Sequence, residues 1–432
     1  MVKLRWLQVN KFRSVKPGTR LDFYQGYNVL LGQNGTGKTT LLNLVAAAVS
    51  LDFSDLKDTE FDISFELASD KGSAILSIRN EHHTHFTSLF NSLLFNIDPL
   101  ALGTTAVKIP FLHTKATFSG KSPSLEITLR GVNASAQTIG EQSPPPPIKL
   151  KLPETVFSLP TWMQLASSLS NWSAQTNAGS GALSEYFALC IVPKKINRFD
   201  ESLEHFNKLT DIIISLSQHP DGHITSTQST EPNETTEALI NLARQKWGED
   251  RYVIKDSALP FLQKTILLLG FESAEATIEL KESTQDDVDP RMLFGSQKFF
   301  FKHRAGWKIS EKHLSYGQKR ILAFMHYLAA IKNTVIADEL VNGLHHSWID
   351  ACIEALGDRQ AFLTSQNPLL LDYLTFESPE EVRTRFVLCS WAKDSDQMVW
   401  ENMSQEAAED FFSSYKVGFQ QVGELLQSKG LW

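Results

Sequence analysis

The chain has 432 residues, 42% of them hydrophobic and 21% charged, which is enough for a packed main domain with a large insertion or a second domain. Its formal net charge of −8 argues against a surface that is basic on all sides and binds nucleic acid nonspecifically, although a local basic patch stays possible. The three cysteines lack C-x-x-C spacing, so neither a disulfide framework nor a zinc site is indicated. With no apolar signal sequence and no stretch of membrane-spanning length, we expect a cytoplasmic protein without a membrane partner.

A glycine-rich loop follows the first buried strand. Lys3–Val9 and Leu21–Tyr24 alternate as paired strands do, and Tyr27–Leu31 is a short apolar strand. The loop then comprises Gly32, Gln33, Asn34, Gly35, Thr36, Gly37, Lys38, Thr39 and Thr40. Residues 38–50 predict a helix with an apolar face, which completes the strand, loop and helix that the G-x-x-x-x-G-K-T pattern requires.

This loop has the chemistry of a phosphate site. Its successive backbone N–H groups form a nest for phosphates, and Gly35 and Gly37 let the chain come close. Lys38 neutralises the outer phosphates, and Thr39 offers its hydroxyl to Mg²⁺. We therefore predict ATP with Mg²⁺ as the ligand.

The middle of the chain changes its periodicity twice. In residues 51–130 polar and apolar residues alternate, which predicts antiparallel strands flanking the nucleotide domain. Residues 131–150 lose this pattern. They include Ser143–Pro147, a stiff spacer that we interpret as a domain boundary. Beyond it we predict a mainly helical lobe. Its helix-spaced segments are Leu159–Leu169, Phe199–Ser217, Glu234–Trp247 and Ser257–Leu269.

Lys298–Arg304 interleaves aromatic and cationic residues. A nucleic-acid surface would show this pattern, and so would a strand with a basic solvent face. We favour the strand, and charge reversal at Lys302 and Arg304 separates the two.

A second phosphate-binding element is predicted at residues 314–320, LSYGQKR, which open the helix ILAFMHYLAAIK. A serine and a glycine at a helix start leave backbone N–H groups pointing outward, where the helix dipole favours an anion. Because the chain already has a glycine loop of its own, we interpret Ser315, Gly317 and Gln318 as contacts to a partner subunit's nucleotide.

An apolar strand, residues 333–337, ends in two carboxylates. An acid at the carboxyl end of a strand beside a phosphate site is where Mg²⁺ needs holding, which fits Asp338. The next side chain faces the other way, so Glu339 can approach an attacking water as general base. Another buried strand, Ala361–Ser365, precedes Gln366, which we interpret as a sensor of the γ-phosphate.

The ordered motifs GQNGTGKTT, LSYGQKR, VIADE and NGLHHSW resemble those of the ABC-type ATPases of the SMC, RecF and OLD (overcoming lysogenization defect) superfamily. The resemblance covers about residues 1–50 and 300–375 and is closest to stand-alone ATPases of prokaryotic antiviral defence. It implies an α/β fold: a P-loop ABC-type ATPase head, with a mixed sheet, flanking helices and an antiparallel β-subdomain, that carries the helical insertion. The expected segments are 1–130 (head and β-subdomain), 131–295 (insertion), 296–400 (rest of the head) and 401–432 (a C-terminal helix).

The same resemblance implies a nucleotide-sandwich homodimer or higher homo-oligomer. Ser315 and Gly317 would close over the γ-phosphate held by the other subunit's Lys38, with Asn342–His345 across the interface. Lys11-Phe12-Arg13-Ser14 resembles an N-terminal element near the nucleotide, which implies a role for Arg13. The family's usual switch histidine is Gln366 here, which cannot carry a proton, so slow hydrolysis is expected.

We therefore expect an ATP-driven switch that controls a nuclease-like effector protein in trans, with antiviral defence as the setting. The alternative is a DNA-binding clamp in repair or recombination. Asp394-Ser395-Asp396 stands alone in a polar loop and predicts a solvated turn rather than a nuclease centre. The apolar stripe from Ala408 to Leu426 packs on the chain's own core or on a partner, and we favour the core.

Overall fold

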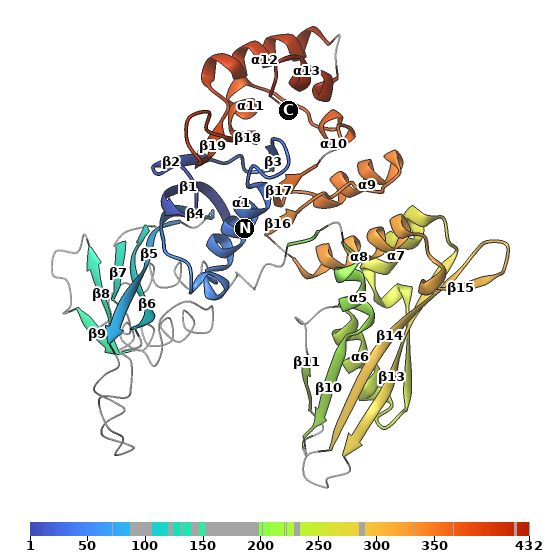
Figure 1. The fold of residues 1–432 in the computed structure, drawn as a ribbon. Helices are drawn as coiled ribbons and strands as arrows, with labels where there is room; N and C mark the ends of the chain where they lie inside the picture. The colour runs from blue at the N-terminus through green and yellow to red at the C-terminus, as the bar shows by residue number, and fades with distance from the viewer. Residues whose placement is uncertain are drawn as a thin grey trace, which may run out of the picture. The chain divides into compact units, whose positions relative to one another are not determined.

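The structure is a computed structural model of residues 1–432. It describes the whole chain apart from positions 71, 87–105, 120–123, 131–132, 140–146, 152–197, 201, 220, 222, 229–233, 285–289, 332, 366, 419–420 and 432. The chain divides into two compact units (Figure 1). The first comprises Met1–Asn197, Phe376–Phe419 and Leu425–Trp432, and the second comprises Arg198–Thr375 and Gln420–Glu424.

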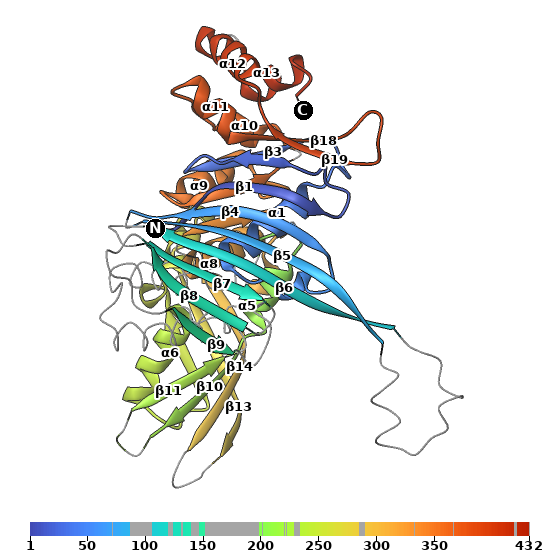
Figure 2. The ribbon, with the colours of Figure 1, turned by 90° about the vertical axis from the view of Figure 1, so that its left-hand side faces the viewer.

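An eight-stranded antiparallel sheet, in the order β2-β1-β4-β5-β6-β7-β8-β9, dominates the first unit (Figure 2). Its strands are β1 (Lys3–Phe12), β2 (Thr19–Asp22), β4 (Phe61–Ala68), β5 (Ser73–Phe86), β6 (Ala106–Ser119), β7 (Ser124–Arg130), β8 (Asn133–Ile139) and β9 (Ile148–Lys151). The pairing of β1 with β2 and the strand character of residues 51–130 are as expected. The boundary at residue 130 is wrong, because β8 and β9 continue the same sheet beyond it.

Three strands of a smaller mixed sheet also lie in this unit, and the first of them leads into the glycine loop. They are β3 (Tyr27–Leu31), β18 (Phe386–Trp391) and β19 (Met398–Asn402). β18 runs parallel to β3 and antiparallel to β19. The described helices here are α1 (Lys38–Ser50), α11 (Pro379–Arg385), α12 (Gln405–Val417) and α13 (Val422–Ser428), and the first three residues of α13 belong to the second unit.

The C-terminal stripe does not form one helix. Gly418 has a φ of 74° and ends α12, so the apolar positions are divided between α12 and α13. Of the predicted stripe residues, Ala408, Val422 and Leu426 are buried, and the Tyr415 ring lies edge-on to that of Phe376 with 5.3 Å between centroids. The described part of the stripe therefore packs on the chain itself, as we favoured from the sequence.

The second unit is built on an antiparallel sheet in the order β11-β10-β14-β13-β12, with β15 paired to β14. Its strands are β10 (Ile213–Gln218), β11 (Ile224–Gln228), β12 (Arg251–Lys255), β13 (Ser273–Thr284), β14 (Arg291–Lys302) and β15 (Lys308–Ser310). Three helices contact these strands, and Figure 1 shows the helix α6 running along them. They are α5 (Glu204–Thr210), α6 (Glu234–Gln245) and α7 (Pro260–Leu269).

The expected mainly helical lobe is therefore wrong for the described part of residues 198–295. The segment Phe199–Ser217 contains one helix, α5, and then the strand β10, in which Ile214 and Leu216 are buried on one face. Short apolar runs fit both periodicities, so the sequence pattern could not separate them. The predicted boundary at residue 296 is also wrong, because it falls inside β14. The predicted helix Leu159–Leu169 and the Ser143–Pro146 part of the spacer lie outside the described residues.

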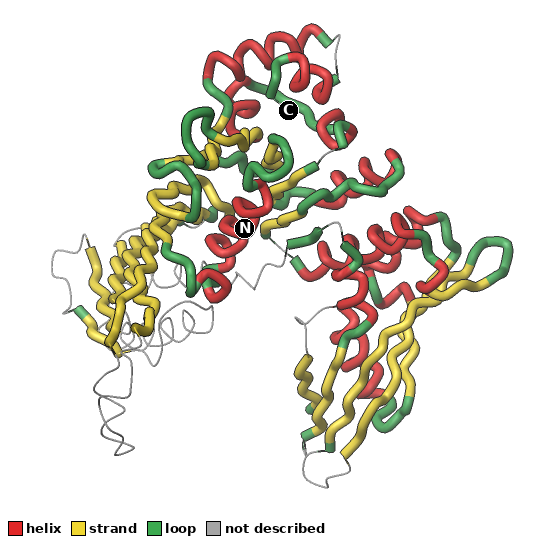
Figure 3. Tube along the Cα trace, in the orientation of Figure 1, coloured by secondary structure: helices red, strands yellow, loops and turns green. Residues whose placement is uncertain are grey.

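The rest of the second unit carries the acid pair. Two parallel strands, β16 (Thr334–Ala337) and β17 (Gln360–Thr364), are accompanied by α8 (Tyr316–Ala330), α9 (His346–Leu356) and α10 (Leu369–Asp372). Short 3₁₀ helices lie at Ser54–Leu56, Asp256–Ala258 and Glu311–His313. The tube in Figure 3 shows the mixture of helix and strand in both units, which confirms the α/β class. Within the described ranges, no helix has the length and apolarity to cross a bilayer.

Candidate functional site

The glycine loop connects β3 to α1 as the sequence predicts. Lys38 is only 8% exposed, and its Nζ donates hydrogen bonds to the carbonyls of Gly32 at 2.7 Å and Gln33 at 3.0 Å. Gly35 and Gly37 have φ values of 81° and 85°, which a residue with a Cβ adopts only with strain. The loop thus folds around its lysine, with Gln33, Asn34, Gly35 and Thr39 exposed.

Residues of β18 and β19 hold this loop, and the sequence analysis missed them. A Cβ on Gly32 would lie 2.1 Å from the carbonyl oxygen of Cys389, and one on Gly37 would lie 2.4 Å from Met398 Sδ. Trp400 is buried and donates its indole N–H to the Thr36 carbonyl at 3.2 Å. Burial raises the pKa of the Cys389 thiol to about 12, so this side chain is a neutral packing group. Two close approaches and one side-chain hydrogen bond therefore fix the loop.

Arg13 lies in the turn after β1, with a φ of 46°. The turn is tied to β19, because Met398 N–H donates to the Ser14 carbonyl at 2.7 Å and Lys16 N–H donates to the Met398 carbonyl at 2.9 Å. Met398 therefore joins the turn that carries Arg13 to the glycine loop. This arrangement brings the turn beside the glycine loop and is not visible in the sequence, while the role of Arg13 stays a prediction.

The acid pair follows β16 directly, as predicted. The Thr364 hydroxyl, at the end of β17, donates to Asp338 Oδ1 at 2.5 Å and accepts from Glu339 N–H at 2.9 Å. Glu339 has a φ of 50°, an uncommon backbone conformation for a residue with a side chain. One hydroxyl thus orients both residues of the pair, whereas Gln366 lies outside the described residues.

Arg198 is a second residue that the sequence analysis missed. Its Nη1 lies 3.4 Å from Asp338 Oδ2 and forms an ion pair. The two residues are 140 positions apart, and no local pattern connects them.

The helix predicted after residues 314–320 is α8, and it begins with a capping box. Ser315 Oγ accepts from Gln318 N–H at 3.3 Å, and Gln318 Oε1 accepts from Ser315 N–H at 2.9 Å. Gly317 is buried at this helix start, where a Cβ would lie 2.9 Å from the Gly343 carbonyl oxygen. The capping box and the 342–345 loop therefore form one packed surface in the second unit.

Arg320 anchors this surface to the acid pair. It is 1% exposed, and its guanidinium donates to the carbonyls of Glu339 at 2.9 Å and Leu340 at 3.0 Å. Arg320 therefore ties α8 to the backbone of Glu339.

Each unit offers an oxygen ligand of the kind that Mg²⁺ binds. Mg²⁺ is usually bound through one or two carboxylates plus substrate phosphates, and Asp338 of the second unit supplies a buried carboxylate. Thr39 supplies a hydroxyl at the start of α1. In the described part of the chain, no cluster of three or more His, Cys, Asp or Glu residues could hold a metal without such a ligand.

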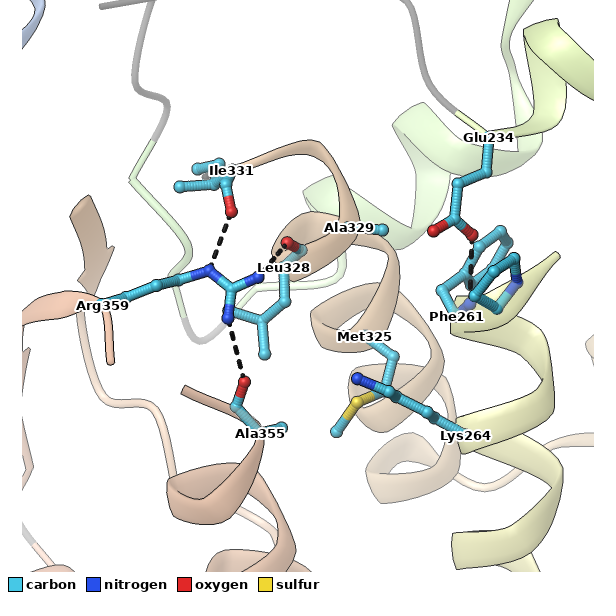
Figure 4. Close-up of a pocket in the computed structure, with 10 residues that line it drawn as sticks. Glu234, Phe261, Lys264, Met325, Leu328, Ala329, Ile331, Ala355 and Arg359 are labelled. Atoms are coloured by element: carbon cyan, nitrogen blue, oxygen red, sulfur yellow. Dashed lines mark hydrogen bonds between the residues drawn. The ribbon is translucent and has the colours of Figure 1, made fainter. Parts of the chain in front are cut away.

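A pocket of about 290 Å³ lies elsewhere in the second unit, between α7, α8 and the residue Arg359 (Figure 4). The guanidinium of Arg359 donates to the carbonyls of Leu328 and Ile331, at the end of α8, and to that of Ala355, near the end of α9. Burial lowers the pKa of Arg359. The side chain caps two helices, which is a structural role.

The surroundings of Lys298–Arg304 support the predicted strand. Lys298 and Lys302 lie on β14 and form ion pairs with Glu279 of the neighbouring β13 and with Glu272, which directly precedes β13. Both lysines therefore have acidic partners beside the strand.

Two family models match this chain. A model described as AAA domain matches residues 7–247, and a second AAA-domain model, whose description adds the AbiEii toxin and type IV TA system, matches residues 182–372. The search of curated proteins found no match.

Solved structures show only distant likeness. The SMC head bound to the C-winged helix domain of ScpA is 12% identical with a TM-score of 0.39, over 94% of this chain and 99% of that chain. The SMC head domain from Thermotoga maritima is 11% identical with a TM-score of 0.36, over 93% and 99%. The recombination mediator RecF of the RecFOR pathway is 13% identical with a TM-score of 0.30, over 93% and 98%. We draw no argument about function from likenesses at this level.

Proposed function

This chain belongs to the AAA-domain family, and from that premise we propose that it is an ATPase that binds Mg²⁺–ATP through its glycine loop and hydrolyses it through its acid pair. The observation that carries the proposal is the loop itself, in which Lys38 is held by the Gly32 and Gln33 carbonyls and both Gly35 and Gly37 have positive φ. A loop of this form presents backbone N–H groups and one ammonium to phosphate oxygens.

The proposed roles follow from the chemistry of each group. Lys38 and the loop N–H groups bind the β- and γ-phosphates, while Thr39 and Asp338 are the Mg²⁺ ligands. Glu339, oriented by the Thr364 hydroxyl, accepts a proton from the attacking water. With Gln366 in place of a group that can carry a proton, hydrolysis is slow.

We further propose that ATP closes a homodimer. Ser315 and Tyr316 are exposed at the start of α8, and Gly317 beside them packs close to the Gly343 carbonyl. An exposed helix start suits a partner's γ-phosphate. ATP binding then favours the dimer, and ATP hydrolysis allows the dimer to dissociate, because a ligand that binds one state more tightly shifts the equilibrium toward that state.

The experiment compares Glu339→Gln with Lys38→Ala. With ATP and Mg²⁺, the first variant retains nucleotide and sediments as a dimer, because binding is intact and hydrolysis is blocked. The second binds no nucleotide and stays in the nucleotide-free assembly state. Analytical ultracentrifugation and a fluorescent ATP analogue measure both properties. Equal nucleotide binding by the two variants would refute the role of the glycine loop.

The biological setting that we propose is antiviral defence, with an effector protein controlled in trans. The match to a family model whose description names a toxin of a type IV TA system supports this class of role. Glu339→Gln purified from its host should then retain a stoichiometric protein partner.

A DNA clamp is the second candidate, and one observation favours it. At the β14–β15 turn the ring of Trp307, 48% exposed, stacks on His303 with 4.4 Å between centroids, beside the exposed Arg304. Exposed aromatic rings next to cations suit base stacking. ATPase activity that DNA stimulates, and that Trp307→Ala no longer shows, would favour the clamp over the switch.

A further inference from the structure

A three-residue segment, Arg198–Asp200, lies along the edge of β16. Phe199 bridges Ala337 in parallel, with Phe199 N–H donating to the Ile336 carbonyl at 2.8 Å and Asp338 N–H donating to the Phe199 carbonyl at 2.7 Å. The Phe199 ring is 1% exposed and packs on Phe324 at 5.1 Å. Backbone pairing and a buried ring therefore fix this segment beside the acid pair.

The far end of the segment is also fixed. Arg320 donates from Nη1 to the Asp200 carbonyl at 2.8 Å and from Nη2 to the Glu339 carbonyl at 2.9 Å. One buried guanidinium thus joins the segment to the backbone of the acid pair. Arg198 has little freedom to leave this place through backbone motion.

This placement brings Arg198 to the carboxylate that the proposed function assigns to Mg²⁺. Its Nη1 lies 3.4 Å from Asp338 Oδ2, while Oδ1 of the same carboxylate accepts the Thr364 hydroxyl at 2.5 Å. The two charged side chains are 24% and 13% exposed, so solvent screens them less than a surface pair.

We propose that Arg198 is a positioning residue that neutralises Asp338 and competes with Mg²⁺ for its carboxylate, so that metal loading requires the ion pair to open. Two cations at one carboxylate repel each other, and Mg²⁺ needs an oxygen at about 2.0–2.1 Å in a near-octahedral shell. The ion pair therefore raises the metal concentration at which the nucleotide site fills. This inference rests on the proposed function, because it concerns the metal of the same ATP site.

The test measures metal binding rather than ATPase activity. Mn²⁺ is titrated into the full chain with adenylyl imidodiphosphate, a non-hydrolysable ATP analogue, and bound Mn²⁺ is counted by electron paramagnetic resonance. Arg198→Ala should lower the half-saturating Mn²⁺ concentration about tenfold, which corresponds to about 1.4 kcal/mol. Arg198→Lys keeps a cation and should stay near the wild-type value.

Arg383→Ala is a matched control. Arg383 also pairs with a carboxylate, that of Glu380, and its side chain is 26% exposed, close to that of Arg198. It lies on α11, away from the acid pair in the sequence, and its loss should leave Mn²⁺ binding unchanged.

Each outcome decides the proposal. Tighter Mn²⁺ binding in Arg198→Ala alone supports it, while unchanged or weaker binding overturns it. Equal values for Arg198→Ala and Arg198→Lys overturn the role of charge. If the alanine variant does not fold, the lysine variant is compared with the wild type, and a half-saturating Mn²⁺ concentration about tenfold below the wild-type value overturns the role of charge. Failure of the wild-type chain to bind the ATP analogue overturns the proposed function and this inference together, whereas normal wild-type binding without an Arg198→Ala shift overturns the inference alone.

Discussion

Gly32 and Gly35 lie in the same loop and differ in one physical respect, which makes their alanine variants a sharp test of how the loop is held. Both have positive φ, 144° and 81°, so each substitution strains the backbone. A Cβ on Gly35 meets nothing within 4 Å, whereas a Cβ on Gly32 lies 2.1 Å from the Cys389 carbonyl oxygen on β18. The difference between the two variants therefore isolates the contact between the loop and β18.

The magnitudes follow from these contacts. Gly35→Ala should lower the free energy of unfolding by about 1–2 kcal/mol, the cost of a left-handed residue with a Cβ. Gly32→Ala adds the displacement of a strand carbonyl, about 1–3 kcal/mol for overpacking, because backbone cannot rotate away as a side chain can. The expected loss for Gly32→Ala is about 2–5 kcal/mol, a large part of the stability of a typical domain.

Urea unfolding followed by circular dichroism measures these losses. The two units can unfold separately, so the transition that shifts must be assigned to the first unit, for example by limited proteolysis along the titration. Fluorescent ATP-analogue binding is measured in parallel and should be weakened far more in Gly32→Ala than in Gly35→Ala. Equal destabilisation by the two variants would refute the claim that β18 fixes the loop.

Three further predictions concern the second unit. Gly317→Ala places a Cβ 2.9 Å from the Gly343 carbonyl oxygen, so it should weaken ATP-dependent dimerisation about tenfold or more in sedimentation, with ATP binding to the monomer unchanged. Thr364→Val removes the hydroxyl that binds the Asp338 carboxylate and the Glu339 backbone N–H, so steady-state kinetics should show kcat lower by about 10–100-fold while nucleotide binding persists. Burial lowers the pKa of His326 from 6.5 to about 4, so the unfolded chain binds the proton first as the pH falls. The free energy of unfolding should therefore drop, by at most about 3 kcal/mol between pH 6.5 and pH 4, and urea titrations of His326→Phe should lose this part of the pH dependence.

Features whose residues are contiguous could be predicted from the sequence. The strand 27–31, the glycine loop and the helix 38–50 agree with the structure to the residue, and the acid pair follows its strand as expected. In these cases the residues that form the turn, set the hydrophobic periodicity and supply the functional groups are neighbours in the sequence. Local propensity and local geometry therefore agree.

The sequence pattern was wrong where a short apolar run was decided by its partners. Residues 213–218 become β10 because β14 and β11 lie on either side and accept their backbone hydrogen bonds. The strands β8 and β9 likewise belong to a sheet that starts at residue 3, which no boundary in composition reveals. Strand pairing joins distant segments, and its energy is absent from any local window.

Only the tertiary structure decided what surrounds the candidate site. Trp400 binds the Thr36 carbonyl, the Cys389 carbonyl excludes any side chain at Gly32, and Arg198 pairs with Asp338. Each partner lies more than a hundred positions away along the chain and carries no motif of its own. The sequence alone determined which groups can do the chemistry. The packing of distant segments decided which residues surround these groups. It therefore decided the electrostatic environment and the mobility of each catalytic or binding side chain, because electrostatic and steric interactions depend on distance in space.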